Sequence, residues 1–345
     1  MNALRWILPG VAAALIAGAA HQLLGATAVA GRSDPVRLVN AAAPVDDLPV
    51  LKTHRYKMAG RIRPLLFWIG RDDVGLGEIV WRGADGAVAY ELLIGTDAAK
   101  APRGINRWGY ILEDSRPTGT RVLGLMTTSE EATLSDVRKQ VDEGQRRGRF
   151  KAIDARIASG ASRSATETIE TERDLTVHDK IALVVQVEER LKRAVPRDTV
   201  VPSGVRPGFL TAVDELVTDT VAARREGPAA LRRLKGHKTS YVWGRNLFDL
   251  TLKDVESMPP SAAASASNTS PVHADFEIRS RTTGARYTFE LEYGTDGELA
   301  GVPTLIRHQP RWWLQAVLTL DDKAAPAAAG VTDAMSGLAT ATRLR

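Results

Sequence analysis

The chain has 345 residues, of which 44 % are hydrophobic, and it carries a formal net charge of +5. It contains no cysteine, which excludes a disulfide scaffold and an anchor built on a lipidated cysteine. So small a charge excess over so long a chain argues against nucleic-acid binding, which usually shows a concentrated basic face. Because no disulfide can form, a hydrophobic core must hold the chain together. A chain of this length can form one large or two smaller domains.

Residues 1–30 have the features of a secretory signal peptide. Arg5 provides the positive n-region, residues 7–20 (ILPGVAAALIAGAA) form an apolar core, and Ala28 and Ala30 fit the small-x-small cleavage rule. An uncleaved anchor is the alternative, but a proline and two glycines interrupt the ~20 continuous apolar residues that a membrane span needs. We therefore predict cleavage near Ala30, a periplasmic or extracellular mature chain, and no transmembrane segment after cleavage.

The first structured region is predicted to be β. An extended lead covers residues 31–51, and residues 52–125 then contain five strand-like segments separated by turn residues: YKMAGRI, PLLFWIG, GEIVWRG, AVAYELLIG and NRWGYILED. Short, closely spaced strands rich in aromatic and β-branched residues favour antiparallel meanders. Asp72 and Asp73, in GRDDVG, fall between two of these segments, where a polar turn is expected.

Residues 126–235 are predicted to form a helical middle with a hairpin arm. Ser129 is a candidate N-cap for a helix over residues 130–147 that has acids in its first turn and arginines in its last. Alternation over residues 150–176 indicates a hairpin. The segments HDKIALVVQVEERLKRA and GFLTAVDELVTDTVAARR place apolar residues on one face and predict two amphipathic helices.

Residues 236–322 return to strand patterns and predict a curved sheet, followed by a flexible tail over residues 323–345. The low-complexity stretch at residues 257–272 is expected to be a long loop within one sheet, with a domain linker as the alternative. The predicted fold class is α+β, with a predominantly antiparallel sheet, curved or half-barrel-like, and a helical middle. Whether the two β regions share one sheet is left open by the pattern.

Several segments resemble other exported bacterial proteins. YTFELEYG and PTLIRHQPRWWLQAVLTL are similar to the closing strands of uncharacterised exported β-rich proteins with half-barrel character, and so are RIRPLLFWIGRDDVGLGEIVW and RGINRWGY. The resemblance covers about two thirds of the chain. It implies a half-barrel fold and an exported location, and it assigns no functional residue.

Motifs that carry chemistry are few. The sequence has no nucleophile elbow, no H-E-x-x-H and no phosphate-binding glycine loop, and its six histidines do not pair at metal-ligand spacing. Asp72 and Asp73 are a candidate site for a hard cation or for acid and base chemistry, and a polar turn explains them equally well. We expect no cofactor.

Two aromatic segments are candidate ligand sites. One gathers arginines and aromatics that can clamp an anionic or ring-shaped group: Arg103, Asn106, Arg107, Trp108 and Tyr110. Its alternative is a loop whose Trp and Tyr plug the sheet. The other is the pair Trp312 and Trp313, whose side chains should point to opposite faces of a strand. Parity with Leu314, Ala316, Leu318 and Leu320 predicts a buried Trp312 and an outward Trp313. We expect Trp313 to pack against a covering helix, and the alternative is an exposed indole that lines a groove or meets a membrane surface.

These observations lead to a hypothesis with two alternatives. The first is an exported, non-catalytic envelope protein that binds a lipid or another amphipathic small molecule in the concave side of the sheet, with Trp243, Phe248 and Trp313 as candidate contacts. One alternative is an exported hydrolase of glycan or ester that pairs Asp72 or Asp73 with Glu113. The other is a structural or assembly factor of the envelope. Nucleic acid is not expected as a partner.

Overall fold

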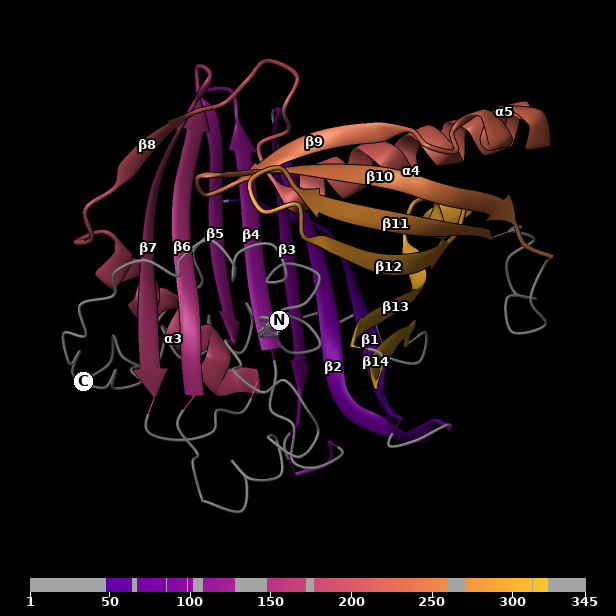
Figure 1. The fold of residues 1–345 in the computed structure, drawn as a ribbon, viewed down its shortest axis with the longest axis horizontal. Coiled ribbons are helices and arrows are strands. Elements are labelled where there is room, and N and C mark those ends of the chain that lie inside the picture. Colours follow the sequence, from indigo (N-terminus) through magenta and orange to yellow (C-terminus); the bar gives the residue numbers. More distant parts are fainter. Residues whose placement is uncertain are drawn as a thin grey trace, which may run out of the picture.

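A single open antiparallel sheet of fourteen strands organises the protein in the computed structural model (Figure 1). The structure describes residues 48–63, 67–84, 86–97, 99–101, 108–127, 148–171, 177–259, 271–311 and 313–321. The fold is α+β and predominantly antiparallel, as predicted. The predicted signal peptide, the helix at 130–147 and the tail at 323–345 lie outside the described residues. None of the helices in the described ranges is long and apolar enough to cross a bilayer.

The first eight strands run outward from the middle of the sheet to one edge. They are β1 Val50–Ile62, β2 Ile69–Ala84, β3 Ala87–Thr96, β4 Trp108–Arg116, β5 Gly119–Thr127, β6 Gly148–Ala158, β7 Ala161–Thr171 and β8 Arg197–Val200. Each pairs antiparallel with the next. The segment expected to be a hairpin arm forms β6 and β7, and it lies within the sheet because β5 and β8 pair on either side of it.

The last six strands run inward from the other edge. They are β9 Lys238–Trp243, β10 Asn246–Ser257, β11 Val272–Ser280, β12 Arg286–Tyr293, β13 Pro303–Arg311 and β14 Leu314–Leu320. β14 pairs with β1 from Tyr56↔Leu320 to Ile62↔Leu314, so both β regions share one sheet with its seam at this pair. β10 pairs directly with β11, so the low-complexity stretch connects strands of one sheet.

Helices cover the two faces of the sheet at different places. In the described residues the helices are α3 Val177–Leu191, α4 Phe209–Glu226, α5 Pro228–Arg233 and the short 3-10 helix η4 Gly297–Leu299. The two amphipathic patterns correspond to α3 and α4. α3 packs on β6 and β7, and α4 packs on β9 and β10. In Figure 1 the strands β9–β12 run across the direction of β3–β7, and α4 lies behind β9 and β10.

Alternating side chains of the strands build two separate cores. The larger joins one face of both halves of the sheet to α4 through Phe209, Leu216 and Val217. The smaller lies on the opposite face of the first half, where Leu183 and Val187 of α3 cover it. Burying both faces of the central strands explains their near-continuous apolar runs.

The strand β2 differs from the predicted pattern. PLLFWIG and GEIVWRG were expected to be separate strands with a turn at Asp72 and Asp73. β2 instead runs unbroken from Ile69 to Ala84, with a bulge where residues 72–74 stand opposite a single residue of β1. Asp73 has φ 53° there, and aspartate tolerates this left-handed conformation better than most residues.

Candidate metal centre

A group of polar side chains occupies the outer face of β11 and β12. Val272, Ala274 and Phe276 of β11 point to the core, so the intervening His273 and Asp275 project from the opposite face. The register places His273 opposite Glu292 and Asp275 opposite Glu290 on β12. Two adjacent strands therefore present one imidazole and three carboxylates side by side.

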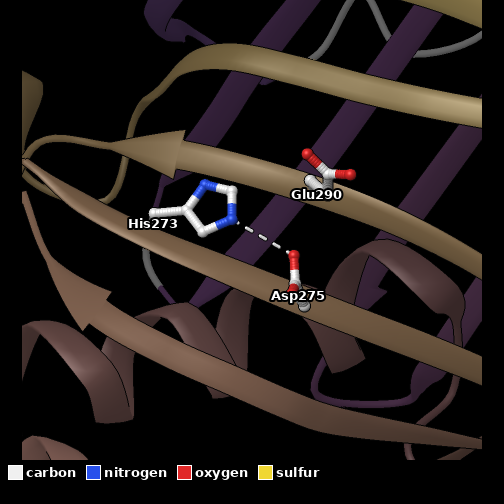
Figure 2. A group of neighbouring side chains, drawn as sticks. All are labelled: His273, Asp275 and Glu290. Carbon is white, nitrogen blue, oxygen red and sulfur yellow. Dashed lines mark ion pairs between the residues drawn. The ribbon is translucent and has the colours of Figure 1, made fainter.

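The distances within this group suit a cation. His273, Asp275 and Glu290 each offer one ligand atom, and these three atoms lie within 4.8 Å of one another (Figure 2). His273 Nε2 is 3.2 Å from a carboxylate oxygen of Asp275, while Nδ1 is 3.9 Å from Glu292 Oε1. A metal-binding histidine usually donates the proton of its other nitrogen to a carboxylate or carbonyl. Glu292 is placed to accept that proton after a small side-chain adjustment.

Neighbouring cations already neutralise part of the negative charge. Arg307 of β13 forms an ion pair with Glu290. Asp254 of β10 lies opposite Asp275 in the register and accepts a hydrogen bond from Lys235 Nζ at 2.9 Å. This bond is the largest contribution that lowers the pKa of Asp254. A bound metal would have to compete with Arg307 for Glu290.

The donor set indicates the class of metal. Mg²⁺ and Ca²⁺ prefer oxygen ligands alone, whereas an imidazole beside carboxylates suits Zn²⁺ and other first-row transition metals. Three protein ligands leave at least one coordination position to water. The side chain of Asp275 is 45 % exposed, so solvent reaches the group directly.

Trp108 and Tyr110, two of the predicted ligand-site residues, are buried in the smaller core. The Trp108 ring packs on Phe150 with centroids 4.8 Å apart, and the Tyr110 hydroxyl donates to Glu91 Oε2 at 3.5 Å. Burial raises the pKa of Tyr110 well above its ordinary value. These two side chains thus pack in the core against the sheet, as expected if the segment is a loop whose Trp and Tyr plug the sheet. Arg103, Asn106 and Arg107 lie outside the described residues.

The aromatic residues expected to contact an apolar ligand are also buried. Trp313 is 6 % exposed and belongs to the larger core, so its predicted outward position is wrong. β14 begins only at Leu314, and the register shifts between His308 and Arg311, so strand parity does not extend back through Trp312 and Trp313. Trp312 itself lies outside the described residues. Trp243 and Phe248 are buried in the same core, beneath α4.

The acidic residues considered for catalysis are far apart. Asp73 forms a 2.9 Å ion pair with Lys100, and Asp72 is exposed beside it in the bulge. Across the strands, Glu113 is aligned with Trp81 of β2. Trp81 is eight positions along β2 from Asp73, so Glu113 and Asp73 are roughly 20 Å or more apart at ~3.3 Å per residue. Catalytic carboxylate pairs lie within about 10 Å, so the pair proposed for a hydrolase is not assembled.

Glu113 has a structural role at the beginning of α4. The N-cap residue is Gly208, which has no side chain to cap the helix. The fully buried Glu113 accepts hydrogen bonds from the N–H of Leu210 at 2.7 Å and from the N–H and Oγ1 of Thr211, both at 2.8 Å. Burial raises the pKa of Glu113, and these bonds oppose that shift. A Cβ at Gly208 would overlap this carboxyl group.

Sequence reasoning missed the metal centre because its ligands come from two strands. The signal is present as H-x-D in HADFE and E-x-E in FELEYG, where alternation puts each pair on one strand face. Only the register between β11 and β12 shows that these faces meet. Comparisons of the chain with protein-family models, with curated proteins and with solved structures find no match.

Proposed function

We propose that this protein is an exported, non-catalytic binding protein whose ligand is a divalent transition-metal cation. The observation that carries the proposal is the setting of His273, which has Asp275 beside Nε2 and Glu292 beside Nδ1. Glu290 completes the group of three ligands. Paired strands hold the backbone of all four residues, so the site needs little ordering before a cation binds.

The exported location is supported by the N-terminal sequence. Residues 1–30 combine Arg5, an apolar core and an alanine-rich cleavage site. The non-catalytic assignment is supported by the use of Glu113 as a helix cap. It is also supported by the position of His273 on an outer sheet face that solvent reaches directly.

A titration of the chelator-treated protein with Zn²⁺ tests the proposal. Isothermal titration calorimetry should detect one site, and Ca²⁺ should not compete for it, because calcium has little preference for an imidazole ligand. The bound cation should also raise the unfolding temperature by mass action. His273→Asn and Asp275→Asn should each weaken binding by at least about tenfold, since each removes one of three ligands.

His237→Asn is the matched control. His237 also lies near an aspartate, with Nδ1 3.7 Å from Asp219, but it has no place in the group of three ligands. This variant should bind Zn²⁺ as the unaltered protein does. If His273→Asn binds Zn²⁺ with unchanged affinity, or if both histidine variants lose it equally, the assignment of the site is wrong.

A further inference from the structure

The hairpin of β1 and β2 carries an exposed apolar end. We call residues 61–63 and 67–71 the hairpin tip. Phe67 is 62 % exposed and Ile69 is 48 % exposed. Trp68 lies between them, with the guanidinium carbon of Arg63 6.0 Å from its ring centroid. Most large apolar side chains of the described residues are buried, and the other neighbouring pair exposed at a strand end is Val50 and Leu51 at the beginning of β1.

The backbone carries this tip away from the core. The pairing of β2 with β3 ends at Gly75↔Thr96, so residues 69–74 extend past that partner. The bulge at residues 72–74 lies within this extension, and a bulge bends the strand that contains it. In Figure 1 the lower end of β2 curves outward from β3 and β4. Ile69 and Arg71 therefore sit on the paired part of a projecting hairpin, and Phe67 and Trp68 directly precede it.

Basic side chains surround the apolar ones. Arg61 and Arg71 are exposed, and Arg63 is half-buried against Trp68. Of the nearby acids, Asp73 is already paired with Lys100 at 2.9 Å, and Asp72 and Asp97 contribute two further negative charges. The hairpin tip thus combines a net positive charge with aromatic and aliphatic side chains on one projection.

We propose that the hairpin tip docks on the surface of an anionic lipid bilayer. Phe67 and Ile69 enter the boundary between headgroups and acyl chains, Trp68 lies at the level of the headgroups, and the arginines bind lipid phosphates. A bilayer deforms around a narrow projection. A protein partner would need a matching pocket and about 1,000 Å² of contact, which so small a tip does not offer alone. This inference does not depend on the metal centre.

Vesicle sedimentation with the purified full-length protein tests the proposal. Binding should be clear with mixed phosphatidylcholine and phosphatidylglycerol vesicles, weaker with phosphatidylcholine alone, and reduced by salt. The double variant Phe67→Ser, Ile69→Ser should lower the partition coefficient at least about tenfold, because two inserted side chains are lost. Arg61→Gln should lower binding to the anionic vesicles alone.

Matched controls distinguish docking through the hairpin tip from non-specific adsorption of the protein to vesicles. Val195 and Val200 are 86 % and 80 % exposed near β8, which is one edge of the sheet and lies far from β1 and β2 in the strand order. Val195→Ser, Val200→Ser should bind vesicles as the unaltered protein does. Lys253→Gln, exposed on the second half of the sheet, is the charge control. All variants share the apolar N-terminal residues, so differences between them report on the tip.

The outcomes distinguish a lipid bilayer from a second copy of this chain as the partner of the hairpin tip. Loss of vesicle binding in the tip variants and not in the controls supports the proposal. Tip variants that bind as the unaltered protein does, or controls that lose binding equally, overturn it. If vesicles are not bound and the tip variant instead abolishes self-association in analytical ultracentrifugation, the tip binds a second copy of this chain and the lipid assignment is wrong.

Discussion

Acidification should destabilise the protein through His308. This side chain is 2 % exposed and lies on β13 between Phe289 of β12 and Ala316 of β14. Its Nδ1 lies 2.8 Å from the carbonyl oxygen of Thr288, so Nδ1 must carry the proton in the neutral ring. Nε2 has no hydrogen-bond partner among the described residues. A proton added there would place an uncompensated charge in the core.

The magnitude follows from the shift in pKa. Burial lowers the pKa of His308 from 6.5 to about 4. Since the folded pKa lies below the unfolded value, the unfolded chain binds more protons. Stability is therefore full above pH 6.5 and falls as the pH drops toward 4. At about 1.36 kcal/mol per pH unit the loss is about 2 kcal/mol at pH 5 and about 3.4 kcal/mol well below pH 4.

Urea unfolding at several pH values between 8 and 4 measures this loss. His308→Gln removes the titrating ring and keeps a donor for the Thr288 carbonyl. The free energy of unfolding of this variant should therefore fall less on acidification than that of the unaltered protein, by about 2 kcal/mol at pH 5. Carboxylates titrate in both proteins and cancel in the difference. His237→Gln, at an exposed histidine, is the control for replacing a histidine elsewhere in the chain. Equal pH dependence in His308→Gln and the unaltered protein would refute the reasoning.

Three further outcomes are expected. Glu113→Gln should lower the free energy of unfolding in urea by about 2–4 kcal/mol, because an amide cannot accept three hydrogen bonds where the carboxylate did. The exposed Glu256→Gln should change it by less than about 0.5 kcal/mol, and equal effects would show that the cap is unimportant. Trp313→Ala should cost about 3–5 kcal/mol in the same assay, and a loss below about 1 kcal/mol would contradict its burial. Arg307→Gln should strengthen Zn²⁺ binding severalfold in calorimetry, since it removes the cation that competes for Glu290. Weaker binding would show instead that Arg307 orients this carboxylate.

Local patterns in the sequence predicted the elements whose formation depends on nearby residues. Apolar spacing predicted α3 and α4, because each helix needs only one stripe for the core. Alternation and turn residues predicted the antiparallel strands. The pattern failed at β2, because a bulge and a turn both require a polar residue that tolerates unusual backbone angles, and Asp73 fits either.

Features that depend on long-range pairing could not be predicted. The single sheet depends on the pairing of β1 with β14, and nothing in either strand's composition specifies its partner. The metal centre depends on the register of β11 with β12, which brings His273 to Glu292. Trp313 was assigned to the wrong side because parity requires the exact beginning of a strand, which is the least certain part of any strand prediction.

The seam between β1 and β14 has a consequence for folding kinetics. Lys57 and Asp321, joined by an ion pair of 3.0 Å across this seam, are 264 positions apart in the chain. Closing so large a loop is entropically costly and gives the domain a high contact order, which slows folding. During synthesis β1 must wait for β14 with one edge unpaired, although it can already pair with β2. An unpaired edge is prone to aggregation, so we expect refolding to be slow and its yield to fall as protein concentration rises.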